Sequence, residues 1–281
     1  MEIGIRAHDL GKNTITGLLD KAKEFGFDNL QLVFKKGFID SEGNPVPFNE
    51  ENAKIVAEEL KKRNLHVAML GAYFNPVHSN KELVKENTEY FEEHLRLAHI
   101  LDCKYVGTET GSYNDDKWTY NPKNQTEEGY LETMKTFTHL KDVAEKYNTT
   151  LLMEPAWGHV IFSVDQLKRA IDELHSPKVK VTIDIFNLIY LGNYKKYKEI
   201  FENALATFKE DVKIIHLKDF YVKDDKIVQC GLGKGIIDFD FIVSTVYKYS
   251  PNATLVFEGV TGDDIKPSLK LIDTIVKKLK K

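Results

Sequence analysis

The chain alternates short runs of apolar and β-branched residues with longer segments in which apolar residues recur every three or four positions. The short runs are EIGIRA (2–7), DNLQLVF (28–34), HVAMLGA (66–72), KYVGTET (104–110), TTLLMEP (149–155), KVKVTID (178–184), VKIIHLK (212–218) and ATLVFEG (253–259). Several runs are almost continuously apolar, which is typical of parallel strands covered on both faces. We therefore predict eight parallel β-strands at these positions.

The segments between the runs have the pattern of amphipathic helices. In residues 80–101, for example, Leu83 and Phe91 belong to an apolar set at helical spacing, and Ser79 with Glu82 forms a capping-box pattern before it. Eight alternating strands and helices in a chain of this length predict a closed (β/α)8 TIM barrel. A doubly wound open sheet is the alternative, but IRAHDLGKN after the first run lacks the glycine-rich phosphate loop of that fold.

Length and composition agree with one soluble barrel. The 281 residues suit a single α/β barrel, so we expect one domain over 1–281. A hydrophobic content of 42% with a net charge of −4 gives no general attraction to nucleic acid or anionic membrane. No apolar run reaches membrane-spanning length. Two cysteines are too few for a disulfide framework, and the first residues have no signal-peptide pattern, so we expect a cytoplasmic protein.

Four predicted strands end on residues that can bind a metal ion. The fifth ends on Glu154, the sixth on Asp184, the seventh on His216 and the eighth on Glu258. In a barrel the carboxyl ends of the strands meet at one mouth, where three carboxylates would repel one another unless a cation neutralised them. Taken singly, an acid there more often caps a helix or pairs with a lysine, and His216 could be a core histidine. Together, the four residues favour one Mn²⁺, Mg²⁺, Co²⁺ or Zn²⁺ ion in an open, catalytic site.

These same stretches carry a family resemblance. LLMEP, VTIDIFN, IIHLKD, GLGKGIIDF (231–239) and LVFEG resemble the xylose isomerase-like TIM barrels, which include sugar and sugar phosphate isomerases and epimerases. The resemblance implies that Glu154, Asp184, His216 and Glu258 hold one divalent metal ion and that the two glutamates form the acid–base pair. The implied reaction is proton transfer on a sugar through an enediolate, with Glu258 as the abstracting base and Glu154 as the group that returns the proton.

The chain departs from two branches of that family. The related apurinic endonucleases carry a histidine where this chain has Asn187 and another where it has GTETG (107–111), so a three-metal phosphodiesterase is not expected. The ketose 3-epimerases share the first histidine and have an arginine downstream of His216, which FYVKDDK (220–226) lacks. The alternative functions are therefore a metal-dependent lyase, of the inosose or dehydroshikimate dehydratase type, and a sugar-binding barrel without catalysis.

Further residues at the predicted mouth are candidates for binding the substrate, namely His8, Glu109, Trp157, Asn187 and Lys218. Trp157 is interpreted either as an apolar wall for a sugar ring or as packing beneath a loop. Lys218 is interpreted either as a substrate contact or as a partner of Asp219. We expect a small-molecule sugar or polyol as the partner, with neither nucleic acid nor membrane, and a homo-oligomer is compatible with the sequence.

Overall fold

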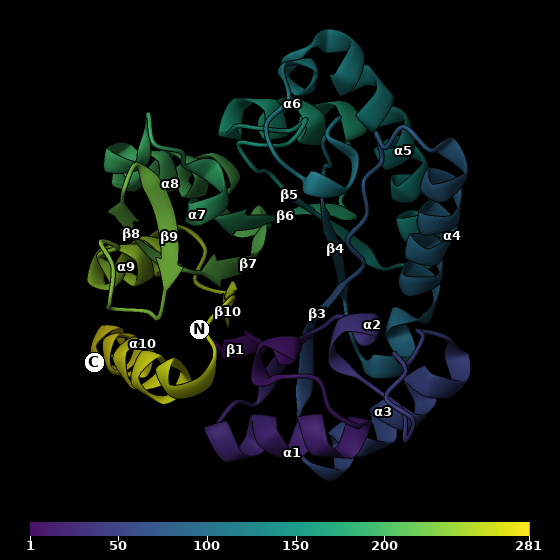
Figure 1. The fold of residues 1–281 in the computed structure, drawn as a ribbon, viewed down its shortest axis with the longest axis vertical. Helices are drawn as coiled ribbons and strands as arrows, with labels where there is room; N and C mark the ends of the chain where they lie inside the picture. The colour runs from purple at the N-terminus through teal and green to yellow at the C-terminus, as the bar shows by residue number, and fades with distance from the viewer. Residues whose placement is uncertain (281) are drawn as a thin grey trace.

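Eight parallel strands close into a barrel in the order β1-β10-β7-β6-β5-β4-β3-β2 (Figure 1). The structure is a computed structural model that describes residues 1–280, so Lys281, the last residue of the predicted domain, lies outside the described residues. The barrel strands are β1 (Ile3–Arg6), β2 (Asn29–Leu32), β3 (His66–Gly71), β4 (Tyr105–Glu109), β5 (Thr150–Glu154), β6 (Val179–Asp184), β7 (Val212–Leu217) and β10 (Thr254–Phe257). Each lies within one of the eight apolar runs, so the predicted (β/α)8 barrel is confirmed.

The helices surround this barrel (Figure 1). They are α1 (Ile15–Phe25), α2 (Phe34–Gly37), α3 (Glu50–Lys62), α4 (Lys81–Leu97), α5 (Glu127–Lys146), α6 (Val164–Leu174), α7 (Ile185–Leu188), α8 (Tyr197–Phe208), α9 (Phe239–Tyr249) and α10 (Ile265–Leu279). Short 3₁₀ segments are η1 (Ala7–Leu10), η2 (Ala98–Leu101), η3 (Asp115–Lys117), η4 (Pro122–Gln125), η5 (Tyr194–Lys196), η6 (Lys209–Asp211) and η7 (Gly262–Asp264). None of the helices in residues 1–280 combines the length and the apolar character that crossing a membrane requires.

One predicted helix start is wrong by one residue. The N-cap of α4 is Asn80, whose side chain accepts hydrogen bonds from the backbone N–H groups of Glu82 and Leu83. Ser79 instead donates its hydroxyl to Asp115 in the loop after β4, at 2.8 Å. Because asparagine and serine cap helices about equally well, adjacent candidates cannot be separated by residue type alone.

An antiparallel hairpin interrupts the alternation of strands and helices after β7. Its strands are β8 (Asp219–Lys223) and β9 (Lys226–Cys230), joined by a turn in which Asp224 and Asp225 have positive φ values. The hairpin returns to the barrel through Gln229, whose amide donates to the backbone carbonyl of Glu258 at 2.7 Å. This hairpin is not among the elements predicted from the sequence.

The side chains that point into the barrel come from alternate residues of each strand, and this alternation continues to the mouth. The interior of the barrel is filled by a small cluster from β3, β5, β7 and β10, namely Ala68, Met69, Leu152, Ile214 and Val256. Because strand side chains alternate between faces, the residue two positions further along points the same way. That next position is Glu154 in β5, His216 in β7 and Glu258 after β10, and Asp184 follows the buried Thr182 in β6 in the same manner. The alternation of strand residues therefore aims all four side chains into the mouth.

Candidate metal centre

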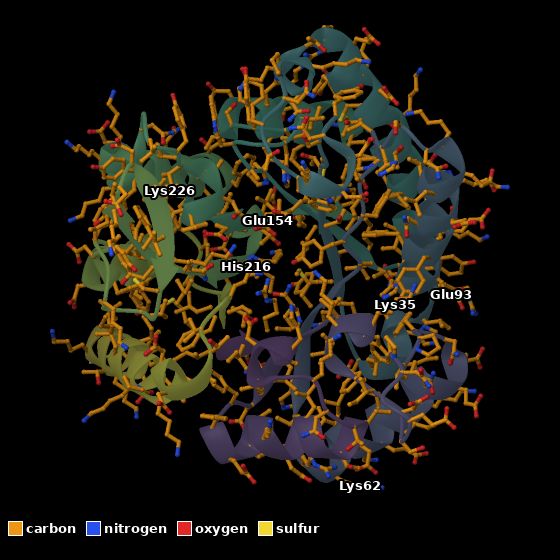
Figure 2. The ribbon with its side chains drawn as sticks, viewed as in Figure 1. Lys35, Lys62, Glu93, Glu154, His216 and Lys226 are labelled. Carbon is orange, nitrogen blue, oxygen red and sulfur yellow. The ribbon has the colours of Figure 1, made fainter. Side chains whose placement is uncertain are left out.

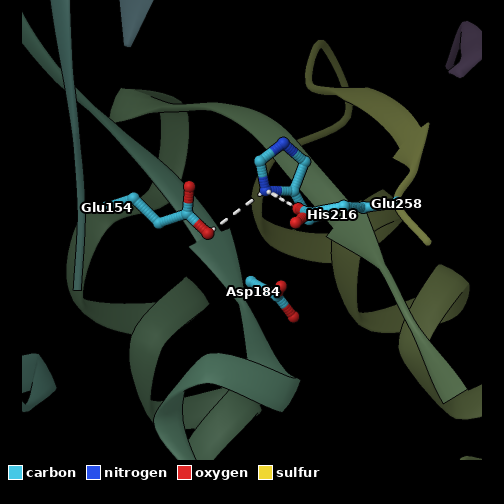
Figure 3. A group of neighbouring side chains, drawn as sticks. All are labelled: Glu154, Asp184, His216 and Glu258. Carbon is cyan, nitrogen blue, oxygen red and sulfur yellow. Dashed lines mark hydrogen bonds and ion pairs between the residues drawn. The ribbon is translucent and has the colours of Figure 1, made fainter. Parts of the chain in front are cut away.

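Glu154, Asp184, His216 and Glu258 converge at the mouth of the barrel. Each offers one ligand atom, and these four atoms lie within 4.8 Å of one another (Figure 3). The Nδ1 atom of His216 lies 2.9 Å from Glu258 Oε2 and 3.2 Å from Glu154 Oε1, which come from opposite sides of the imidazole. Glu154, Asp184 and His216 are at most 2% exposed. The structure thus brings together the four residues that the sequence singled out.

A chain of hydrogen bonds behind His216 fixes its ring. The Nε2 atom lies 2.7 Å from Gln31 Oε1, and Gln31 donates through Nε2 to the Tyr73 hydroxyl at 2.7 Å. The carbonyl oxygen of Gln31 can only accept, so Nε2 carries a proton and Nδ1 faces the carboxylates. Burial alone would lower the pKa of His216, but Glu154 and Glu258 outweigh it and raise this pKa to about 10. Partners of this kind orient metal-binding histidines in proteins.

Lys218 adds a buried ammonium to the cluster. Its Nζ atom lies 2.8 Å from Asp184 Oδ2 and 2.9 Å from Glu258 Oε1. Burial opposes its charge, but the two carboxylates raise the pKa of Lys218 above its usual value, so it stays a cation. It does not pair with Asp219, whose carboxylate instead accepts backbone N–H groups of Gly233 and Gly235 at 2.9 and 2.8 Å. The proposed alternative of a Lys218–Asp219 pair is therefore wrong.

Glu258 is also held from the first strand. Arg6, the last residue of β1, donates from Nη1 to Glu258 Oε1 at 2.6 Å, and its Nε and Nη2 atoms donate to Asp9. The barrel closes at this point, because β1 and β10 are neighbours. Burial alone would raise the pKa of the Glu258 carboxyl, but Lys218, His216 and Arg6 hold it well below its usual range. Glu258 is therefore an anion surrounded by three basic groups.

Glu109 and Asn187 complete the acidic side of the mouth. The Nδ2 atom of Asn187 donates to Glu154 Oε1 at 2.9 Å and to Glu109 Oε1 at 3.2 Å. Burial, together with the charges of Glu154 and Glu258, raises the pKa of Glu109 to about 8. Glu109 is therefore protonated near neutral pH, whereas Glu258 is ionised. Two carboxyl groups in one mouth with opposite protonation states can act as an acid and a base.

A cavity of about 380 Å³ opens over this cluster, and Glu109, Glu154 and Glu258 all line it. Its aromatic lining comes from Tyr73 and Trp118. Figure 2 shows Glu154 and His216 near the centre of the ring of helices, as expected for a barrel mouth. A volume of this size lies at the lower end of the range for small-molecule sites.

The candidates for substrate binding occupy different places. His8 and Glu109 line the cavity. Trp157 does not line it: its ring stacks on Tyr190 at 3.9 Å and on Tyr120 at 5.6 Å, and it borders a separate cavity of about 290 Å³. Trp157 therefore packs beneath a loop, which was the second of its two interpretations. Trp118 is the tryptophan that lines the cavity over the cluster.

The donor set fits a divalent ion. Three carboxylates and one imidazole provide hard oxygen ligands with one nitrogen, which suits Mg²⁺, Mn²⁺, Co²⁺ or Zn²⁺. The Oδ2 atom of Asp184 is buried, and its one close partner among residues 1–280 is the Lys218 ammonium at 2.8 Å. Asp184 also caps α7, because its Oδ1 atom accepts the Phe186 N–H at 2.9 Å. One oxygen is thus used locally, and the other faces the Lys218 ammonium, whose place a metal ion would take or share.

Several residues at the mouth were not predicted from the sequence, namely Arg6, Asp9, Gln31, Lys36, Tyr73 and Trp118. Arg6, Lys36 and Tyr73 each follow or end a barrel strand, so reading the ends of the first three strands as closely as the last four would have found them. Gln31 lies inside β2, and a fully buried glutamine in a strand is a signal that a polar partner is nearby. Trp118 lies in the long loop after β4 and has no such signal.

A family model described as the xylose isomerase-like TIM barrel matches residues 19–278. No curated protein sequence matches the chain.

Solved structures with the same fold include enzymes of two kinds. A 3-keto-D-glucoside 4-epimerase from E. coli has 17% identity and a TM-score of 0.75, with 98% of this chain and 99% of that chain covered. A probable 3-DHS dehydratase from Bacillus anthracis has 14% identity and a TM-score of 0.72, with 99% of each chain covered. A xylose isomerase-like TIM barrel protein from Mycobacterium smegmatis, solved with magnesium, has 14% identity and a TM-score of 0.73, covering 98% and 93%. At these identities the likeness establishes the fold.

Proposed function

This chain belongs to the xylose isomerase-like TIM barrel family, and from that premise we propose that it is a metal-dependent isomerase or epimerase of a sugar or sugar phosphate. The observation that carries the proposal is the convergence of Glu154, Asp184, His216 and Glu258, with both glutamates lining the cavity above. The epimerase among the similar structures supports this reaction class. A single domain over residues 1–281, a cytoplasmic location, a homo-oligomer and the absence of nucleic-acid and membrane partners stay predictions.

Each residue of the cluster has a role in this proposal. Glu154, Asp184, His216 and Glu258 would hold one divalent ion, whose charge would stabilise the negative charge that develops on the carbonyl and adjacent hydroxyl oxygens of the substrate. Glu258 is ionised and lines the cavity, so it is placed to remove the proton from the carbon beside the carbonyl. Glu154 faces it across His216 and returns a proton, on the opposite face in an epimerisation.

One observation favours a dehydratase as the second candidate. Loss of water begins with the same proton abstraction, but it also requires an acid that protonates the departing hydroxyl group. Glu109 lines the cavity and has a pKa raised to about 8 by burial and by its neighbours Glu154 and Glu258, so it can donate that proton near neutral pH. The dehydratase among the similar structures agrees with this alternative.

A panel of ketoses, aldoses, sugar phosphates and cyclic polyol ketones, incubated in ²H₂O with and without Mn²⁺, tests the proposal. An isomerase or epimerase incorporates deuterium next to the carbonyl and returns a product of otherwise unchanged mass, with Mn²⁺ required. A product lighter by one water identifies the dehydratase. Absence of exchange across the panel, with sugar binding intact in calorimetry, would contradict both reactions and leave a sugar-binding barrel.

A further inference from the structure

Acidic and basic side chains both line the cavity above the metal cluster, and they meet where Arg6 binds Glu258. The carboxyl groups of the cavity come from β4, β5 and the end of β10, whereas its basic side chains, Arg6, His8 and Lys36, come from β1, η1 and α2. In the barrel β1 and β2 are adjacent, so the basic side chains gather on one side of the mouth. A metal ion held by the cluster would neutralise the acidic side and leave the basic side to act on the rest of the ligand.

Lys36 is the clearest cation on that side. It is exposed, and no carboxylate of residues 1–280 lies within 4.0 Å of its Nζ atom. Its ammonium stands 5.8 Å from the centre of the Tyr73 ring, which lines the same cavity. The preceding residue, Lys35, is also exposed but points elsewhere: its Nζ atom lies 4.0 Å from the Tyr90 ring, and Figure 2 shows it well away from Glu154 and His216.

Arg6 and His8 offer further unused donors beside Lys36. Three of the five N–H groups of the Arg6 guanidinium are taken by Asp9 and Glu258, which leaves two for a ligand. His8 lines the cavity beside Lys36; its Nδ1 atom is turned away from solvent and has no hydrogen-bond partner in the described part of the chain, so it is its exposed ring edge that faces a ligand. Burial and the positive charges of Arg6 and Lys36 lower the pKa of His8 to about 3, so His8 is a neutral group in a positive potential.

We propose that Lys36, Arg6 and His8 form a subsite for an anionic substituent, phosphate or carboxylate, on the sugar whose reacting carbons lie over the metal cluster. This inference rests on the proposed function and specifies its substrate class. A phosphate or carboxylate accepts several N–H donors at once, and hydrogen bonds between charged groups are about twice as strong as neutral ones. The hydroxyl groups of a neutral sugar can accept hydrogen bonds from the same donors, but they would not neutralise the charge of the Lys36 ammonium.

The first test compares three substrates on the protein loaded with Mn²⁺: a ketose, its terminal phosphate ester and the corresponding sugar acid. We expect kcat/KM for deuterium exchange to be higher for one or both anionic substrates, and the better of the two identifies the anion. Lys36→Gln should lower kcat/KM for that substrate by about 10-fold or more, and more than for the free ketose. Lys35→Gln, the matched control, should leave it unchanged. Preference for the free ketose, or equal effects of the two variants, would overturn the subsite.

The second test is independent of turnover. Binding of inorganic phosphate to the protein saturated with Mg²⁺ is measured by calorimetry, and Lys36→Gln should weaken it about 10-fold while Lys35→Gln does not. If wild-type protein does not bind phosphate, the subsite is wrong, even where neutral sugars exchange and the proposed function holds. If phosphate binding depends on Lys36 while no sugar exchanges, the subsite stands and the proposed function is wrong.

Discussion

Replacing Asp9 by alanine tests how firmly the mouth of the barrel holds Glu258. Asp9 does not line the cavity, but its carboxylate accepts Arg6 Nε at 3.0 Å, Arg6 Nη2 at 2.9 Å and the Gly259 backbone N–H at 2.6 Å. Arg6 in turn donates to Glu258 at 2.6 Å. Asp9 therefore holds Glu258 in two ways. It binds Arg6, which contacts the Glu258 side chain, and it binds the backbone of Gly259, the residue after Glu258.

The size of the effect follows from these contacts. Alanine removes three hydrogen bonds to a charged acceptor, and each such bond contributes about 1.5–3 kcal/mol. The side chains of Asp9 and Arg6 are 7% and 21% exposed, so water can replace part of what is lost. We therefore expect the free energy of unfolding to fall by about 2–4 kcal/mol rather than by the full sum. Removing an outer partner of a metal ligand typically changes metal affinity by about 10–100-fold, so the Kd for Mn²⁺ should rise by that factor.

Urea unfolding and Mn²⁺ calorimetry on the same samples measure both effects. Asp20→Ala is the matched control, because Asp20 accepts Arg63 Nε at 2.6 Å on the outside of the barrel and is 57% exposed. Such a surface pair contributes about 0–1 kcal/mol, and Asp20→Ala should leave Mn²⁺ affinity unchanged. An Asp9→Ala protein that is destabilised but binds Mn²⁺ as tightly as wild type would refute the view that Asp9 and Arg6 position Glu258.

Two further predictions concern proton transfer and acid stability. Glu258→Gln should weaken Mn²⁺ binding, because it removes a charged ligand, and at saturating Mn²⁺ it should still lower deuterium exchange by at least about 10²-fold, because an amide cannot accept a proton from carbon. Exchange kinetics at saturating Mn²⁺ that match wild type would move the base to Glu154. Burial lowers the pKa of His94 to about 4, whereas histidine in the unfolded chain titrates near pH 6.5. Between these two pH values the unfolded chain binds a proton at His94 and the folded protein does not. Stability should therefore fall between about pH 6.5 and pH 4, with up to about 3 kcal/mol due to His94, and His94→Leu should flatten the urea-unfolding profile over that range.

The sequence predicted the barrel and its metal-type residues because both depend on local patterns. A parallel strand buried on both faces is almost continuously apolar, as several of the eight runs are, and each of the eight runs holds one barrel strand. Glu154, His216 and Glu258 each follow an inward-facing apolar residue by two positions, which is a property of a single strand and needs no knowledge of its neighbours. The convergence of these side chains at one mouth then follows from the closure of the barrel.

The remaining parts of the site depend on contacts between distant segments. Arg6 meets Glu258 across 252 positions of sequence, where the first and last strands close the barrel, and nothing in IRAHD indicates that pair. Lys218 was expected to bind substrate or Asp219, but the neighbouring strands place Asp184 and Glu258 closer to it. The β8–β9 hairpin was missed, although two aspartates between short strand-like stretches are a turn signal.

Anomalous diffraction from crystals grown with Mn²⁺ shows whether one divalent ion binds to Glu154, Asp184, His216 and Glu258. We expect a single strong manganese peak at the mouth of the barrel, with carboxylate oxygens and His216 Nδ1 at about 2.0–2.3 Å, and no peak in Asp184→Asn crystals grown the same way. Wild-type crystals without a manganese peak, in which Lys218 remains paired with Asp184 and Glu258, would contradict this expectation.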